Sequence, residues 1–289
     1  MNSAELQEAF SARPENPVRK ITLHEDVRLI EKLGGWLAVQ HIPTGSLGLD
    51  AELGGGWPVG YISEITGPPA VGSTTLALHG ITGAQRAFPD QVAILYDNMG
   101  SFSPYYAAAC GIDLDRLVLS ALPRKITGEP ASLAVIDPLL GYCGNPRGET
   151  TLVVTQFRTH ITGPGWSNSE SARTGTVESD VRVQLQVSHP VSGGIMARAL
   201  VIHDTFHPVK HEPVYFKIRY GRGIDTKDEL LSLAVKYEVV YKQYGNRYFY
   251  STGRSSLCLG HGWKAAVTTL HLKHIYDAVE MDVREAAGI

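Results

Sequence analysis

A series of short apolar segments in the first half of the chain has the length and composition of buried β-strands. They cover residues 92–97, 132–137 and 151–156, and the first two end in acids, Asp97 and Asp137. Near-continuous apolar segments of this length suit the strands of a parallel sheet that is covered on both faces. The pattern therefore predicts an α/β fold with a mainly parallel central sheet.

From Val181 onward the pattern changes, because apolar and polar residues alternate. Val181, Val183, Leu185 and Val187 are separated by polar side chains, as in a half-exposed strand. Further strands are expected in the region that follows, and then a helix around residues 229–237. A small aromatic β unit and a single final helix over about residues 264–285 complete the expected elements.

Segment 67–75 lies between a strand predicted at residues 61–66 and a helix predicted over residues 74–86. It has the outline of a phosphate-binding loop, G-x-x-x-x-G-K-S/T, except that Ser73 stands where the pattern has lysine. The glycines let backbone N–H groups curl around phosphate oxygens, whereas the lysine would supply charge. Pro69 also removes one backbone N–H from the loop. The alternative is a glycine turn that binds no ligand.

Composition argues against several classes of protein. The formal net charge of −3 lacks the strongly basic balance of many nucleic-acid-binding proteins, although it does not address local patches. Cys110, Cys143 and Cys258 lie far apart without C-x-x-C spacing, so neither a zinc site nor a disulfide framework is predicted. We expect a cytoplasmic protein without membrane partners, since neither a signal-peptide pattern nor an apolar run of transmembrane length occurs.

Five features along the chain carry a resemblance to a known family. They are the segments 42–50, 61–68, 220–224 and 229–235, followed by a glycine turn at Gly260 and Gly262. Together they resemble the bacterial RecA recombinase family over about residues 42–270. The resemblance implies a RecA-like P-loop core with a small α+β C-terminal domain. The implied division is an N-terminal arm (residues 1–41), the core (42–222) and the C-terminal domain (223–289).

The resemblance also implies a nucleotide site. Thr74 and Asp137 correspond to the Mg²⁺ ligands, Tyr106 to a side chain that stacks on adenine, and Gln156 to a sensor linking nucleotide to DNA. The implied cofactor is ATP with Mg²⁺, and the metal is expected only if nucleotide binds. The candidate nucleotide-binding residues are Gly67, Gly72, Ser73, Thr74, Thr75, Tyr106, Asp137 and Gln156.

Several positions depart from the family pattern in the same direction. Ser73 replaces the loop lysine, Met99 stands at the position of the catalytic carboxylate, and Ser103 replaces an aspartate. The lysines that reach a neighbouring subunit's nucleotide fall near His203 and Thr205. We therefore assign no catalytic residue and do not expect an efficient ATPase.

Shortened connections mark a further departure from the family. The segment 138–150 replaces the first DNA-binding loop and a long crossover helix, and its glycines and prolines argue against any helix. We expect one face of the sheet to lose its helical cover. The N-terminal arm, another subunit or a partner would then shield that face.

The second DNA-binding loop of the family corresponds to residues 158–175. Basic and aromatic side chains in a glycine-containing polar segment suit single-stranded DNA, although the charge is low for tight binding. The candidate DNA-binding residues are Arg158, His160, Trp166 and Arg173.

These features leave more than one function open. The leading hypothesis is a protein of homologous recombination and DNA repair that binds single-stranded DNA or a recombinase filament, with weak or no ATP hydrolysis. A second is a non-catalytic assembly protein that reuses the RecA fold for self-association. A third is an active recombinase whose lost groups are compensated elsewhere.

Overall fold

A computed structural model describes residues 39–120, 131–138, 141–142, 150–158, 172–173, 175–207, 211–243, 245–251 and 256–289. The chain divides into two compact units, Met1–Gln40 and His41–Ile289. The predicted N-terminal arm falls almost entirely outside the described residues, and its boundary at residue 41 stays a prediction.

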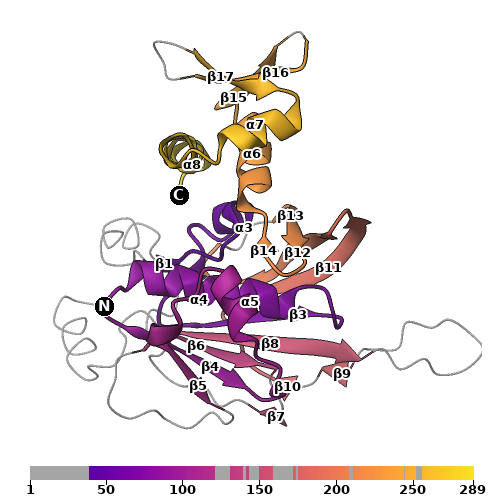
Figure 1. The fold of residues 1–289 in the computed structure, drawn as a ribbon. Helices are drawn as coiled ribbons and strands as arrows, with labels where there is room; N and C mark the ends of the chain where they lie inside the picture. Colours follow the sequence, from indigo (N-terminus) through magenta and orange to yellow (C-terminus); the bar gives the residue numbers. More distant parts are fainter. Residues whose placement is uncertain are drawn as a thin grey trace, which may run out of the picture. The chain divides into compact units, whose positions relative to one another are not determined.

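A ten-stranded sheet forms the centre of the second unit, in the order β14-β13-β12-β11-β3-β8-β6-β4-β5, with β9 beside β8 (Figure 1). Strands β11, β3, β8, β6, β4 and β5 run parallel to their neighbours in this part of the sheet. Strands β12, β13 and β14 continue the sheet as antiparallel neighbours. The predicted α/β fold with a mainly parallel sheet is thus confirmed. The bounds are β3 Ile62–Gly67, β4 Val92–Asp97, β5 Leu117–Ser120, β6 Ala131–Asp137, β8 Thr151–Arg158, β9 Ala172–Arg173, β11 Val181–Val191, β12 Gly194–Asp204, β13 Val214–Arg219 and β14 Gly223–Ile224.

Each face of the sheet is lined by alternate residues of its strands, since successive strand side chains point to opposite faces. On one face, Ile65, Val135 and Leu152 pack with Leu76 and Ile81 of α4 (Ser73–Ala87) in the main apolar core. On the other face, a smaller buried cluster is formed by Ile62, Ile94, Tyr96, Ala134, Ile136, Val153 and Val177. Most of segment 138–150 lies outside the described residues, so the predicted loss of helical cover on this face stays a prediction.

Short elements flank the sheet within the same unit. They are α3 (Leu47–Glu52), α5 (Pro104–Ala109) and the 3₁₀ turn η2 (Leu114–Arg116). Strand β1 (His41–Ile42) pairs with β2 (Trp57–Pro58), and β7 (Gly141–Tyr142) pairs with β10 (Gly175–Thr176).

The C-terminal part has a core of its own, built from α6 (Thr226–Lys236) and a three-stranded antiparallel sheet. Its strands are β15 (Val240–Gln243), β16 (Arg247–Ser251) and β17 (Ser256–His261). The predicted small α+β domain is confirmed as a fold, whereas its predicted boundary at residues 222 and 223 stays a prediction.

The expectation of one final helix is wrong, because the chain forms two: α7 (Trp263–Thr269) and α8 (Lys273–Ala287). Thr268 and Thr269 donate their hydroxyl hydrogens to the carbonyl oxygens of Lys264 (2.8 Å) and Ala265 (3.2 Å), a local alternative that weakens a helix end. The side chain of Leu270, the residue after α7, is fully buried in the C-terminal core. The two helices therefore meet at a turn that combines these threonine hydroxyl bonds with the burial of Leu270.

A buried carboxyl joins this C-terminal part to the start of the core. Glu229 of α6 is 5% exposed, and its Oε1 accepts hydrogen bonds from the Ser46 hydroxyl (2.5 Å) and the Gly48 N–H (3.0 Å). Its Oε2 is buried and has no hydrogen-bond partner among the described residues. Burial raises the pKa of Glu229 from 4.5 to about 7, and the nearby Asp50 carboxyl adds to the shift.

This pKa predicts a pH-dependent stability. Folded Glu229 holds its proton up to about pH 7, whereas the unfolded side chain releases it near 4.5, so its stabilisation is complete below pH 4.5 and lost as pH rises through 7. Between pH 5 and 8 the wild type should lose roughly 2 to 3 kcal/mol of unfolding free energy relative to Glu229→Gln. Urea denaturation at both pH values measures this. The exposed Glu178→Gln change is the control, and parallel pH profiles for wild type and Glu229→Gln would contradict the expectation.

Candidate nucleotide-binding site

The predicted phosphate loop makes a tight turn between a strand and a helix. Strand β3 ends at Gly67, the loop turns through left-handed conformations at Ala70 (φ 64°) and Gly72 (φ 98°), and α4 begins at Ser73. A Cβ added to Gly67 would lie 2.6 Å from the Leu185 carbonyl oxygen. The loop therefore passes too close to its neighbours for a side chain at this glycine. The N-cap residue of α4 is Gly72, which has no side chain to cap the helix, so the first N–H groups of α4 are suited to binding an anion or water.

The loop opens on a pocket of about 310 Å³. Most of the predicted nucleotide-binding residues line this pocket. The two that do not are Gly67, at the start of the loop, and Asp137, which lies next to Thr74. The other wall comes from β12, β13 and the turn after β13, a contribution that no local sequence signal identified. The lining residues are Pro68, Ala70, Gly72, Ser73, Thr74, Thr75, Tyr106, Gln156, Ile195, Ile218, Tyr220 and Gly221.

Ser73 brings no charge to the pocket. Its side chain is only 8% exposed, and its Oγ has no hydrogen-bond partner among the described residues. An unpaired buried hydroxyl carries a desolvation cost that a bound acceptor would relieve. The remaining positive potential of the loop is the partial charge of the helix N-terminus.

The two predicted metal ligands lie together. Thr74, at the start of α4, lies close enough to Asp137, at the end of β6, for its hydroxyl to lower the pKa of that carboxyl. Burial raises the pKa of Asp137 above its usual value of 3.8, and the neighbouring charge of Asp97 raises it further. A hydroxyl beside a carboxylate offers the oxygen ligands that Mg²⁺ takes when it is also held by phosphates.

Asp97 itself organises the loop that follows β4. Its carboxylate accepts the N–H of Phe102 (2.7 Å) and the N–H of Met99 (3.3 Å). Met99 is 65% exposed, so the position expected for a catalytic carboxylate carries an exposed thioether. Ser103 caps α5 by accepting the N–H of Tyr106 at 3.4 Å.

Tyr106 is half-buried at the pocket and fixed by its hydroxyl. The phenolic oxygen and the Thr75 Oγ1 lie 2.8 Å apart, which ties α5 to the first turn of α4. Burial raises the pKa of Tyr106 above 10. The ring is therefore a neutral surface of fixed position, as base stacking requires.

The candidate DNA-binding residues are described only in part. Arg158 ends β8 and Arg173 lies in β9, and the antiparallel pairing of these strands joins the two ends of the segment. His160 and Trp166 lie outside the described residues. His203 and Thr205 are exposed near the end of β12, with His203 Nε2 3.5 Å from Thr205 Oγ1.

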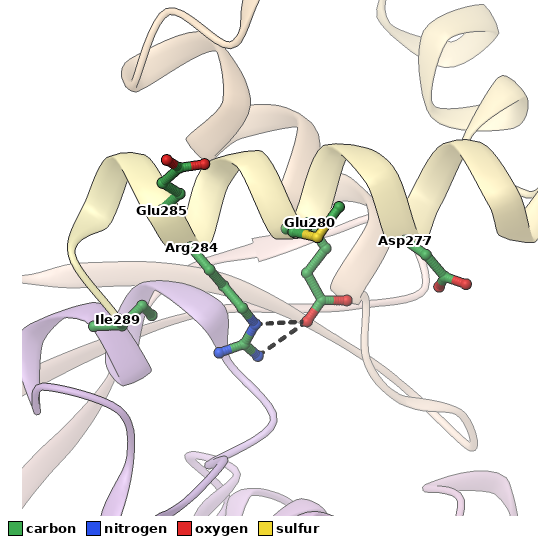
Figure 2. Close-up of a pocket in the computed structure, with 6 residues that line it drawn as sticks. Asp277, Glu280, Arg284, Glu285 and Ile289 are labelled. Atoms are coloured by element: carbon green, nitrogen blue, oxygen red, sulfur yellow. Dashed lines mark hydrogen bonds and ion pairs between the residues drawn. The ribbon is translucent and has the colours of Figure 1, made fainter. Parts of the chain in front are cut away.

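A larger hollow, about 520 Å³, lies along α8 and does not belong to the loop site. Figure 2 shows Arg284 turned toward Glu280, and Arg284 Nη2 lies 2.9 Å from Glu280 Oε1. Arg284 also lies 3.7 Å from Asp50. Since the arginine is paired and the other charged lining residues are acidic, this hollow is unsuited to phosphate.

Comparison with known proteins identifies the chain's relatives. The family model of the RecA N-terminal domain matches residues 26–149. The chain is 30% identical over 304 residues to protein RecA of Lactobacillus johnsonii, covering 87% of this chain and 81% of that protein. It is also 30% identical over 319 residues to protein RecA of Ruegeria pomeroyi, covering 90% and 88%.

None of the described helices is long and apolar enough to cross a membrane. The strand order around the loop, the pocket at the start of α4 and the similarity over most of the length agree with one another. The chain belongs to the RecA family.

Proposed function

We propose that this chain acts in homologous recombination and DNA repair, bound to single-stranded DNA or to a recombinase filament, and hydrolyses ATP weakly or not at all. The proposal is supported by a glycine turn between β3 and α4 that has the outline of a phosphate loop, with Ser73 and the exposed Met99 at the positions of its lysine and catalytic carboxylate. Cytoplasmic location and self-association are part of the same proposal.

Nucleotide binding is supported by the arrangement of side chains at the loop. Thr74 and Asp137 lie next to each other and would provide oxygen ligands for Mg²⁺. Tyr106 is held beside the pocket by the contact of its hydroxyl with Thr75. The volume of about 310 Å³ is at the lower end for small-molecule sites.

Weak hydrolysis follows from the two substituted positions. Lysine would place a full positive charge against the phosphates, whereas the Ser73 hydroxyl offers a single hydrogen bond. Met99 provides no acceptor to orient an attacking water. Each such loss typically costs on the order of a hundredfold in rate.

A connection between nucleotide and DNA is supported by strand β8. Gln156 lines the pocket, and the same strand ends at Arg158, where the candidate DNA-binding segment begins. A ligand that orders Gln156 would therefore act directly on the start of that segment. Arginine contacts to phosphate and stacking on Trp166 would then hold the single strand.

The assembly hypothesis differs in its partners. A RecA fold reused for self-association would form stable oligomers without nucleotide or DNA, and it would show no salt-sensitive DNA binding. A titration of labelled single-stranded DNA, with and without ATP, distinguishes the two functions.

Restoring the two altered groups should restore hydrolysis. We expect wild-type turnover of ATP near background with single-stranded DNA present, and a rise of at least about a hundredfold in the Ser73→Lys, Met99→Glu variant. The neutral pair Ser73→Met, Met99→Gln controls for side-chain size. Wild-type turnover equal to that of an ordinary recombinase would contradict the proposal.

Single-stranded DNA binding should depend on salt through a few phosphate contacts. Arg158→Gln and Arg173→Gln should each weaken binding uniformly across sequences and reduce the slope of log affinity against log salt by about 0.7. Fluorescence anisotropy with labelled oligonucleotides measures both quantities. The matched control is Arg198→Gln in β12, and equal effects from all three changes would remove the role of residues 158–175.

A further inference from the structure

We propose that the contact between α3 and the C-terminal part is controlled by protons, through the buried carboxyls of Asp50 in α3 and Glu229 in α6. This pair of side chains is called the carboxyl contact below. While both side chains are protonated the contact is closed, and their ionisation releases α6 and α8 from α3. Neither residue lines the loop pocket, so the carboxyl contact does not depend on a bound nucleotide.

The two carboxyls lie buried where three helices meet. Helices α3, α6 and α8 pack against one another, and Asp50 is 1% exposed. Asp50 Oδ1 accepts the N–H of Thr44 at 2.7 Å, while Glu229 Oε1 accepts its two hydrogen bonds from the start of α3. The Asp50 charge acts on Glu229, so the ionisation of one side chain affects the other. A proton bound or lost here therefore changes the attraction between the core and the C-terminal part.

Among the residues that the structure describes, one cation faces the carboxyl contact, and it is shared with a third acid. Arg284 Nη2 lies 3.7 Å from Asp50 Oδ2 and 2.9 Å from Glu280 Oε1, and Figure 2 shows the second of these pairs. Glu229 Oε2 is buried without a hydrogen-bond partner in the described part of the chain. Ionisation of both carboxyls would set three carboxylates against one guanidinium, and a buried charge without a partner is strongly destabilising.

Other groups packed against α6 do not supply the missing charge. On β13, Lys217 pairs with Asp228 at 2.8 Å. The second cation of this strand, Arg219, pairs with Asp225 at 2.9 Å. On α8, burial raises the pKa of the Tyr276 hydroxyl to about 12, so that group stays neutral. None of these three side chains offers a free positive charge to the carboxyl contact.

The remaining elements beside α3 and α6 carry charges that are paired or exposed. On α3 itself, Glu52 Oε2 lies 3.4 Å from His211 Nδ1. On β15, Lys242 Nζ lies 5.9 Å from the centroid of the Tyr248 ring, and Lys264 of α7 is exposed. Protonation is therefore the means by which the carboxyl contact avoids an unpaired buried charge.

The pKa values of the two carboxyls fix the direction of the effect. Burial raises the pKa of Asp50 from 3.8 to about 6, although the Thr44 hydrogen bond and the Arg284 charge act in the opposite direction. The pKa of Glu229 is raised from 4.5 to about 7. Both are higher in the folded chain, so the stabilisation is complete below pH 3.8 and is lost as the pH rises through 6 and 7. The carboxyl contact is thus closed in acid and open above about pH 7.

Release of this contact leaves the C-terminal part attached at another place. At the turn before α6, the Ile224 N–H donates to His79 Nε2 of α4, and Asp225 caps the helix. The carboxyl contact is a separate attachment, with Leu47 of α3 packed beside it on the C-terminal core. Because that core is built from the C-terminal part's own side chains, opening lets this part move as a folded body.

Distances between spin labels in the full-length chain test the carboxyl contact. One label is placed on Cys258, exposed in β17, and the other on Ser101→Cys in the exposed loop after β4, in a Cys143→Ser background. At pH 5 we expect one narrow distance. At pH 8 we expect a longer and broader population, at least about tenfold larger than at pH 5. A wild-type distribution that is the same at both pH values would overturn the inference.

Variants that cannot ionise separate this release from a general effect of pH. Asp50→Asn combined with Glu229→Gln should stay closed at both pH values, because each amide keeps an acceptor oxygen and carries no charge. Glu229→Gln alone should remove the part of the transition near pH 7. The matched control is Glu285→Gln, an exposed acid of α8, which should open as the wild type does.

Circular dichroism of the same samples distinguishes release from unfolding. Wild type and variants should give equal spectra at pH 5, and the wild-type spectrum should persist at pH 8. Its loss at pH 8 would mean that the whole chain unfolds, which would overturn the inference. Opening of the double variant Asp50→Asn, Glu229→Gln at pH 8 to the wild-type extent would overturn it as well.

Discussion

The close seating of the phosphate loop against the antiparallel strands is the contact on which the rest of the site depends. A Cβ on Gly67 would lie 2.6 Å from the Leu185 carbonyl oxygen of β11, and Gly72 lies against Ile218 of β13 in a left-handed conformation (φ 98°). Farther along α4, His79 accepts the N–H of Ile224, and burial lowers the pKa of His79 to about 4, which keeps it a neutral acceptor. The pocket lies along this joint between the parallel and antiparallel parts of the sheet.

At this joint the shape of the loop and its charge depend on different residues. Glycine conformations and apolar packing hold the cradle, and neither needs the side chain at position 73. The course of the loop is therefore independent of the charge at position 73, where Ser73 is neutral. The loop thus combines the glycine conformations of its outline with an uncharged side chain at position 73.

The sequence was sufficient to predict those elements whose pattern lies within a single segment. The apolar runs of β4, β6 and β8 and the glycine loop before α4 were predicted within a few residues. Two outcomes had no such signal: the break between α7 and α8, where Leu270 is buried, and the pocket wall formed by Ile195 and Ile218. Both depend on contacts between segments far apart in the sequence.

The sequence by itself determined the α/β class, the P-loop outline and the replacement of the loop lysine, because these are properties of single segments. Only the tertiary structure decided that Thr74 lies beside Asp137, that Tyr106 is fixed by Thr75, and that the turn after β13 borders the pocket. The physical reason is that sheet order brings these strands and turns together, and strand order is a property of the whole fold.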